Sequence, residues 1–203
     1  MFLPNSFYHV YNQGNNRQLI FRNHNDYCIF LRLYKRLILP NASTIAWCLM
    51  PNHFHFMIGT DERCNKAIRQ GGIFIDPISN GIRKLLSGYA RIFNNKTGRT
   101  GSLFRQKTKS KLLADIIQLQ ENPLMTPDYC VTCFHYIHQN PLVAGLVTRM
   151  EDWEFSSFKD YAGLRNGTLC RKDMAALYCQ YQEESFLTKS YELINKKTMG
   201  YLE

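Results

Sequence analysis

Apolar and polar residues alternate in short runs of this chain and recur at helical spacing in longer ones. Residues 6–11 alternate well enough for a first strand, and residues 12–17 interrupt it with polar turn residues. Residues 29–38 then carry apolar side chains at the period of a helix, after Asn25-Asp26 as its N-terminal cap. Pro40-Asn41 ends this helix. The chain therefore opens with a strand followed by a helix.

A β-hairpin is predicted next. Residues 44–50 are β-branched and apolar, Pro51-Asn52 has the chemistry of a turn, and residues 53–58 form the second arm. Successive side chains of a strand point to opposite faces. The second arm thus places His53, His55 and Met57 on one face and Phe54, Phe56 and Ile58 on the other.

The two histidines of this arm are candidate metal ligands. Their imidazoles leave the backbone about 7 Å apart on one face, while the phenyl rings anchor the strand in a core. Two neutral imidazoles on a rigid strand suit a divalent metal. Spacing alone equally fits two ordinary histidines on the polar face of a core strand. The choice between these two interpretations depends on the rest of the chain.

The middle of the chain continues the alternation of elements. Gly71-Gly72 and Asp76-Pro77 mark a loop, residues 79–94 have helical periodicity, residues 96–101 form a basic turn, and residues 103–112 read as a fourth strand. The order is β-α-β-β-α-β, so we expect an α+β, ferredoxin-like fold with an antiparallel sheet. In that arrangement the helices cover one sheet face and leave the other for a ligand.

A further helix follows the fourth strand. Thr126 is its expected cap, Pro127 its first residue, and Pro141 its end. Tyr136 and Asn140 are four residues apart and share one side of it. The helix also contains Cys130-x-x-Cys133, a spacing found in zinc and redox sites, but the chain has no second pair at zinc-ribbon spacing. We therefore interpret these thiols as part of the apolar stripe.

The chain is long enough for one domain with a small addition. We expect residues 1–163 to form the main domain and residues 164–203 a helical C-terminal extension. No apolar run approaches the roughly 20 residues of a membrane span, and the first residues lack the pattern of an export signal. The odd count of seven cysteines favours reduced thiols. A cytoplasmic location is expected.

The charge distribution points to a polyanion. The formal net charge is +9, and no acidic residue lies between Asp76 and Asp115. Nine basic residues fall in that interval: Arg83, Lys84, Arg91, Lys96, Arg99, Arg105, Lys107, Lys109 and Lys111. A solvated surface normally mixes signs, so this run predicts a partner such as nucleic acid, whose phosphates supply most of the binding energy.

Several segments together resemble the REP-associated tyrosine transposases, the single-tyrosine branch of the HUH (His-hydrophobic-His) endonucleases. The matching residues occur in family order: Tyr8-His9-Val10, Gly14-Asn15-Asn16-Arg17, Met50-Pro51-Asn52-His53-Phe54-His55, Gly101-Ser102-Leu103-Phe104-Arg105-Gln106, Tyr136-Ile137-His138-Gln139-Asn140-Pro141, Ala144-Gly145-Leu146-Val147 and Asp152-Trp153-Glu154-Phe155-Ser156-Ser157. They run from about residue 6 to residue 163. Gln13 stands where Arg is commoner, Phe104 where Trp is frequent, and a longer loop occupies residues 71–79.

This resemblance implies a mechanism and a set of residues. Tyr136 would be the nucleophile that forms a 5′-phosphotyrosine, and His53, His55 and Asn140 would bind Mg²⁺ or Mn²⁺. Single-stranded or hairpin DNA would lie on the basic residues Arg17, Arg83, Lys84, Arg91, Arg99, Arg105, Lys107, Lys109 and Lys111. The protein would be a monomer or homodimer associated with the nucleoid. Because only neutral imidazole binds metal, we expect cleavage to fall as pH drops through about 6.5.

Two other classes of function stay open. A non-catalytic nucleic-acid-binding module on a ferredoxin-like fold would use the basic run but not the histidines and Tyr136. A metal-dependent nuclease that activates water would use the histidines but not the tyrosine. Formation of a covalent adduct between protein and DNA would separate all three classes.

Overall fold

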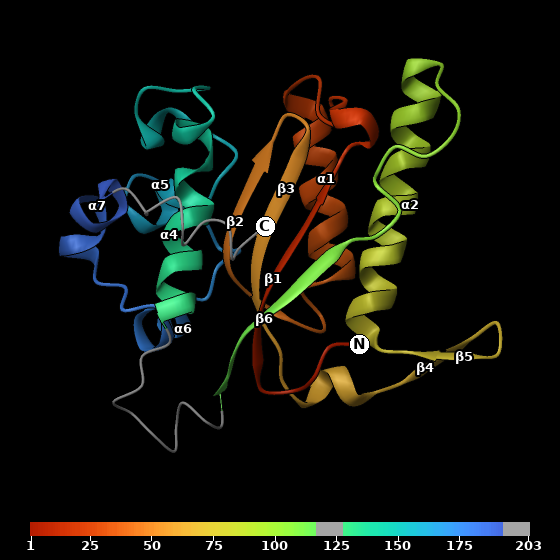
Figure 1. The fold of residues 1–203 in the computed structure, drawn as a ribbon, viewed down its shortest axis with the longest axis horizontal. Coiled ribbons are helices and arrows are strands. Elements are labelled where there is room, and N and C mark those ends of the chain that lie inside the picture. Colours follow the sequence, from red (N-terminus) through yellow and green to blue (C-terminus); the bar gives the residue numbers. More distant parts are fainter. Residues whose placement is uncertain (117–127, 193–203) are drawn as a thin grey trace.

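In the computed structural model, four strands form a central sheet in the order β2-β3-β1-β6 (Figure 1). The strands are β1 (Ser6–Gln13), β2 (Ser43–Met50), β3 (His53–Gly59) and β6 (Lys109–Asp115), and all neighbouring pairs are antiparallel. The structure describes residues 1–116 and 128–192. The expected α+β class with an antiparallel sheet is confirmed.

Two long helices, α1 (His24–Leu37) and α2 (Pro77–Thr97), cover one face of this sheet (Figure 1). The cap of α1 is Asn23, two residues before the expected one, and its side chain accepts a hydrogen bond from the Asp26 amide. Asp76 caps α2 in the same way, with Pro77 as the first helical residue. Gly98 ends α2 at φ 66°, a left-handed conformation that favours glycine.

The first core lies between these helices and the sheet. The rings of Phe54 and Phe56 on β3 face it, as the alternation predicts, and Tyr34 of α1 stacks on Phe56 with ring centroids 4.0 Å apart. Such aromatic burial supplies much of the hydrophobic stabilisation of a domain. It also fixes which way β3 faces, so the histidines between the phenylalanines must point to the opposite side.

The second face of the sheet is partly covered, whereas the sequence predicted it to be open. Helix α4 (Asp128–Val143) packs on it, with α5 (Phe158–Tyr161), α6 (Lys172–Tyr178) and α7 (Glu183–Tyr191) beyond (Figure 1). The buried residues of this second core include Phe7 and Met57 from the sheet, Phe134 and Ile137 from α4, and Ala175 and Phe186 from α6 and α7. The prediction of an open face is wrong where α4 packs on the sheet, because the apolar side chains of β2 and α4 are buried against each other there.

Two element boundaries also differ from the prediction. β6 begins at Lys109, not at residue 103, because the preceding loop crosses the end of β1, where the Arg105 amide donates to the Gln13 carbonyl over 2.9 Å. Helix α4 continues through Pro141 to Val143. A proline inside a helix removes one N–H, but the Ala144 amide still donates to the Asn140 carbonyl. Gly145, at φ 67°, follows the end of the helix. The expected cap at Thr126-Pro127 lies outside the described residues.

The segment expected as a loop contains a small hairpin of its own. Strands β4 (Ile68–Gln70) and β5 (Ile73–Ile75) pair as a separate two-stranded sheet. Gly71 and Gly72 join them at φ 57° and 84°, which side chains larger than glycine rarely adopt. Single turns of 3-10 helix lie at η1 (Asn15–Arg17), η2 (Glu62–Asn65) and η3 (Met150–Asp152). No helix among the described residues is long and apolar enough to cross a membrane.

Candidate catalytic site

His53 and His55 lie on β3, on the face opposite the first core. In the sheet register His55 pairs with Tyr11 of β1 and with Cys48 of β2, so the central position of β3 holds it between two strands. His55 is buried and His53 is partly exposed near the hairpin turn. The two imidazole centroids are 5.0 Å apart and the ring planes are nearly perpendicular. The alternation of the strand therefore places the pair as predicted.

Sequence reasoning missed His9, the third histidine of this site. It is fully buried on β1, and its Nε2 lies 2.9 Å from Nδ1 of His55. The two rings stack with centroids 5.1 Å apart. The alternation of β1 puts His9 and Tyr11 on one face. Only the pairing of β1 with β3 brings that face beside His55, and strand order cannot be read from the strand itself.

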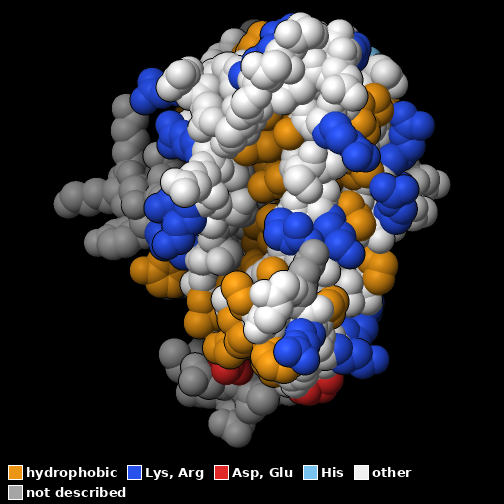
Figure 2. Space-filling view, turned by 90° about the vertical axis from the view of Figure 1, so that its right-hand side faces the viewer, with side chains coloured by type: hydrophobic (Ala, Val, Ile, Leu, Met, Phe, Trp, Pro, Cys, Tyr) orange, Lys and Arg blue, Asp and Glu red, His pale blue; other side chains and the backbone are white. Residues whose placement is uncertain are grey.

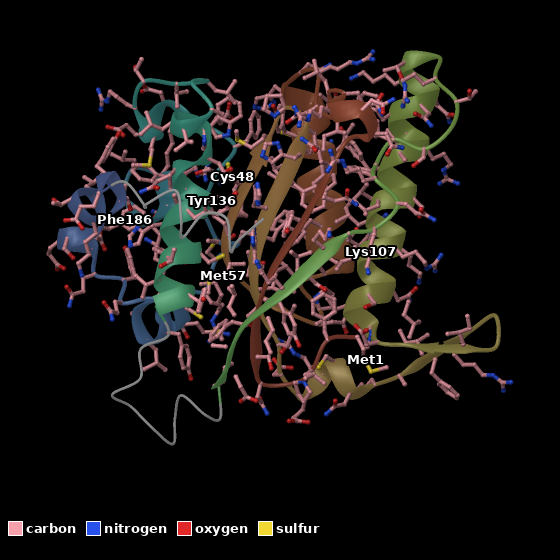
Figure 3. All side chains as sticks on the ribbon, viewed as in Figure 1. Met1, Cys48, Met57, Lys107, Tyr136 and Phe186 are labelled. Carbon is pink, nitrogen blue, oxygen red and sulfur yellow. The ribbon has the colours of Figure 1, made fainter. Side chains whose placement is uncertain are left out.

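Helix α4 contributes Tyr136 and Asn140 from the second face. The Tyr136 ring meets His9 and His55 edge-on, with centroid distances of 5.9 and 5.6 Å. Asn140 donates from Nδ2 to the Tyr136 carbonyl over 2.8 Å, and its side chain hydrogen-bonds His53. Figure 3 shows Tyr136 on the side of α4 that faces the sheet. The four residues singled out from the sequence therefore meet at one place.

Burial keeps both strand histidines neutral. Loss of solvation lowers the pKa of His53 to about 4, although the hydrogen bond to Asn140 acts in the opposite direction. Burial, followed by the proximity of His9 and His53, holds the pKa of His55 well below its usual range. The prediction that cleavage falls through about pH 6.5 assumes ordinary imidazoles, whereas burial lowers the pKa of both residues below that range. Both imidazoles carry a free lone pair at neutral pH, as metal binding requires.

The donor atoms of this site fit a divalent metal. Nδ1 of His53 lies 2.6 Å from Oδ1 of Asn52, so Nδ1 carries the proton and Nε2 carries the lone pair. Nε2 of His55 is buried and has no hydrogen-bond partner among the described residues. Nδ1 of His55 faces Nε2 of His9, and when this bond holds the His55 proton on Nδ1, Nε2 of His55 is a lone pair available to a metal. Within the described residues no three His, Cys, Asp or Glu side chains are grouped for a metal, and the Asn140 side chain, which hydrogen-bonds His53, is a further donor beside the pair.

A basic cleft opens beside the histidines, and we call it the histidine cleft. Its volume is about 610 Å³, and its lining consists of Tyr11, Asn12, Gln13, Arg17, Asn52, His53, His55, Arg105, Lys107 and Lys109. Four of these side chains are positively charged and none is acidic. A cleft of one sign concentrates the electric field and attracts phosphate. Lys111 is adjacent, because it pairs with His9 in the register of β1 and β6.

The segment that follows β1 supports the histidine hairpin at its turn. The Gly14 amide donates to the Asn52 carbonyl over 2.8 Å, and the amides of Ile20 and Phe21 both donate to the Pro51 carbonyl. A Cβ at Gly14 would lie 2.4 Å from the Gln18 carbonyl oxygen, so only glycine fits. Asn16 and Arg17 have φ of 53° and 57°. Left-handed backbone in residues other than glycine is strained and occurs often at functional sites.

Of the remaining basic residues, Arg83 lines a different depression, which we call the α2 groove. It lies between α2 and residues 102–110, has a volume of about 630 Å³, and is lined by Arg83, Arg105 and apolar side chains of α2. Figure 2 shows a hydrophobic hollow on this side of the molecule with Lys and Arg side chains at its borders. Arg105 lines both depressions and so connects them. Lys84, Arg91 and Arg99 line neither.

The two histidines beside Tyr136 on α4 are structural. His135 and His138 are buried, where Nδ1 of His135 bonds to the Ser190 hydroxyl and Nε2 of His138 to the Ser157 hydroxyl. Tyr136 itself is only 2% exposed. Cys130 and Cys133 lie in the second core beside Cys179, and burial raises the pKa of all three thiols.

Comparison with known proteins shows a structural relationship. No protein-family model and no curated protein matches the sequence. Among solved structures, the chain is similar to the structure of a REP-associated tyrosine transposase bound to a REP hairpin. The TM-score is 0.53 at 14% sequence identity, and the match covers 84% of this chain and 94% of that chain. The two proteins share a fold, and at this identity the comparison reaches no further than the fold.

Proposed function

We propose that this chain is a DNA-cleaving and DNA-joining transposase that acts through a covalent bond to Tyr136. The observation that carries the proposal is the meeting of His53 and His55 with Tyr136 and Asn140, from a strand and a helix about 80 residues apart in the sequence. A core tyrosine with no catalytic role has no need of two neutral imidazoles beside it. The shared fold with a hairpin-bound tyrosine transposase favours the same conclusion.

In the proposed reaction the Tyr136 oxygen attacks the scissile phosphorus, and the bond from phosphorus to the 3′ oxygen breaks. The phenolic proton is lost to solvent and the departing 3′ oxygen gains one, which leaves a 5′-phosphotyrosine and a 3′ hydroxyl. The free energy of the phosphodiester is kept, so a 3′ hydroxyl can reverse the step without ATP. A bound Mg²⁺ or Mn²⁺ would polarise the phosphate and offset its developing charge.

The residues of this chain would supply the rest. Nε2 of both strand histidines and the Asn140 oxygen would hold the metal, while His9 holds the ring of His55 through its other nitrogen. Arg17, Arg105, Lys107 and Lys109 would hold the DNA backbone in the histidine cleft. The strand order β2-β3-β1-β6, with α1 and α2 on one face, supports the ferredoxin-like arrangement that this mechanism uses.

Burial of Tyr136 gives weight to the non-catalytic alternative, so the test must distinguish binding from chemistry. A library of single-stranded and hairpin oligonucleotides would be incubated with the protein and Mn²⁺, and covalent adducts would be separated under denaturing conditions. We expect an adduct from the wild type and none from Tyr136→Phe, whose DNA affinity should stay within a few-fold. Tyr129→Phe, on the exposed part of the same helix, is the matched control.

The same assay with His53→Ala and His55→Ala examines the metal site. Both variants should lose cleavage, and Asn140→Ala should lose less because water can replace an amide oxygen. Binding without an adduct in the presence of every divalent ion would favour the non-catalytic module. Cleavage without an adduct would identify a nuclease that activates water.

A further inference from the structure

The β4–β5 hairpin extends away from the rest of the protein and is unusually apolar. It leaves the fold at the foot of α2 (Figure 1). Ile73 is 71% exposed and Phe74 is 65% exposed, and Ile68 is exposed as well. A two-stranded hairpin alone is marginally stable in water, and grouped apolar side chains in solvent usually mark a binding surface. Neither the reaction chemistry nor the histidine cleft uses this element.

The hairpin is also basic. From Arg63 to Ile75 the chain has three positive residues and no negative one. Arg63 is paired with Asp61, Lys66 is exposed just before the hairpin, and Arg69 is exposed on β4. In the register of the two strands Arg69 lies directly opposite Phe74. An aromatic ring beside a guanidinium on one face of a hairpin is the combination that holds a base by stacking and its phosphate by charge.

The position of the hairpin continues the α2 groove. β5 ends at Ile75, α2 begins at Pro77, and Ser79 already lines the groove together with Phe2. The junction is fixed, because the Asp76 carboxylate accepts from the Ser79 amide over 2.8 Å and from the Phe2 amide over 3.4 Å. The hairpin therefore stands at one end of a groove with an apolar floor and basic borders, and Arg105 joins that groove to the histidine cleft.

We propose that the β4–β5 hairpin binds single-stranded DNA that leaves the catalytic site through the α2 groove, with Phe74 stacked on an unpaired base and Arg69 on a phosphate. This rests on the part of the proposed function that has the chain bind DNA. A second copy of the chain is a poorer occupant, because each copy has a net charge of +9 and positive side chains on a strand edge oppose pairing between chains.

The test compares hairpin oligonucleotides without a tail and with oligothymidine tails of increasing length, by fluorescence anisotropy. Phe74→Ala should weaken binding of tailed DNA by roughly 5- to 150-fold and leave binding of tail-less DNA unchanged, since one stacked base contributes about 1–3 kcal/mol. Phe74→Trp should keep the affinity and Phe74→Leu should lose it, which separates stacking from simple apolar contact. Leu177→Ala, which removes a 69% exposed side chain from α6, is the matched control.

Two results would overturn the proposal. One is equal affinity of wild type and Phe74→Ala for tailed DNA. The other is a wild-type dimer in sedimentation that Phe74→Ala converts to a monomer, which would identify a second copy as the occupant. Adduct formation on tail-less DNA separates this inference from the proposed chemistry. If Phe74→Ala lost tail binding but the wild type formed no adduct, only the proposed chemistry would be refuted. If the wild type formed a Tyr136 adduct but Phe74→Ala bound tailed DNA normally, only the role of the hairpin would be refuted.

Discussion

Replacement of His9 should weaken metal binding although His9 itself is not among the proposed ligands. If Nε2 of His55 is to bind a metal, the ring proton must reside on Nδ1, and the atom that accepts it is Nε2 of His9, 2.9 Å away. His9→Phe keeps an aromatic ring against Tyr136 and removes this acceptor. His55 Nδ1–H then loses its hydrogen bond in a buried position.

The size of the effect follows from that buried N–H. An unmatched buried donor costs about 1–3 kcal/mol, and His55 can avoid the penalty by moving its proton to Nε2 or by turning its ring. Either change removes the lone pair from the metal site. Substitutions of groups that orient a ligand typically reduce metal affinity by about 10- to 100-fold. We expect a reduction in that range for His9→Phe and a smaller one for His9→Gln, whose amide oxygen can accept the same proton.

Titration calorimetry with Mn²⁺ measures this without reference to cleavage. DNA affinity in the absence of metal should stay within about two-fold of wild type, because His9 is fully buried and is not part of the cleft lining. If His9→Phe bound Mn²⁺ as tightly as the wild type while His55→Ala bound none, the hydrogen bond between the two histidines would have no part in positioning the ligand.

Two further predictions concern pH and salt. Burial holds the pKa values of His53, His55, His135 and His138 below their ordinary range, so below pH 6.5 the unfolded chain binds protons that the folded chain does not. Urea unfolding should show stability present above pH 6.5 and falling toward about pH 4, by roughly 3 kcal/mol for His135 alone; constant stability across this window would contradict the burial. Arg105→Ala should reduce the slope of log affinity against log salt by about one phosphate contact, whereas Arg36→Ala on α1 should leave it unchanged.

The sequence determined the local geometry of this site better than its surroundings. Alternation on β3 was sufficient to place His53 and His55 together, and helical spacing was sufficient for Tyr136 and Asn140, because both patterns depend only on near neighbours. The place of His9 in the site was not predicted, for the opposite reason. Its role depends on β1 pairing with β3, a contact between residues 46 apart that no local period encodes.

The boundaries that were predicted wrongly share a physical origin in tertiary contacts. Residues 103–108 alternate like a strand, yet the side chain of Asn12 donates to the Arg105 carbonyl and to Thr108 and holds them as a loop. In the same way, the segment 153–157 is tied to the edge strand β2, where the Leu49 amide donates to the Phe155 carbonyl and the Ser157 amide to the Trp47 carbonyl. In this structure both segments contact strands of the central sheet, the first β1 and the second β2.

The C-terminal helices have a closer connection to the candidate nucleophile than their place in the sequence indicates. On α4, His135 bonds to the Ser190 hydroxyl, and Gln139 donates to the carbonyls of Ser190 and Glu192. His135 and Gln139 are one turn apart, and each directly precedes a residue of the site, Tyr136 and Asn140. Neighbouring residues of a helix are rotated by about 100°, so fixing the first pair against α7 fixes the direction of the second pair toward β3. These contacts with α7 and Glu192 therefore help to set the rotation of α4, and with it the distance from the tyrosine to the histidines.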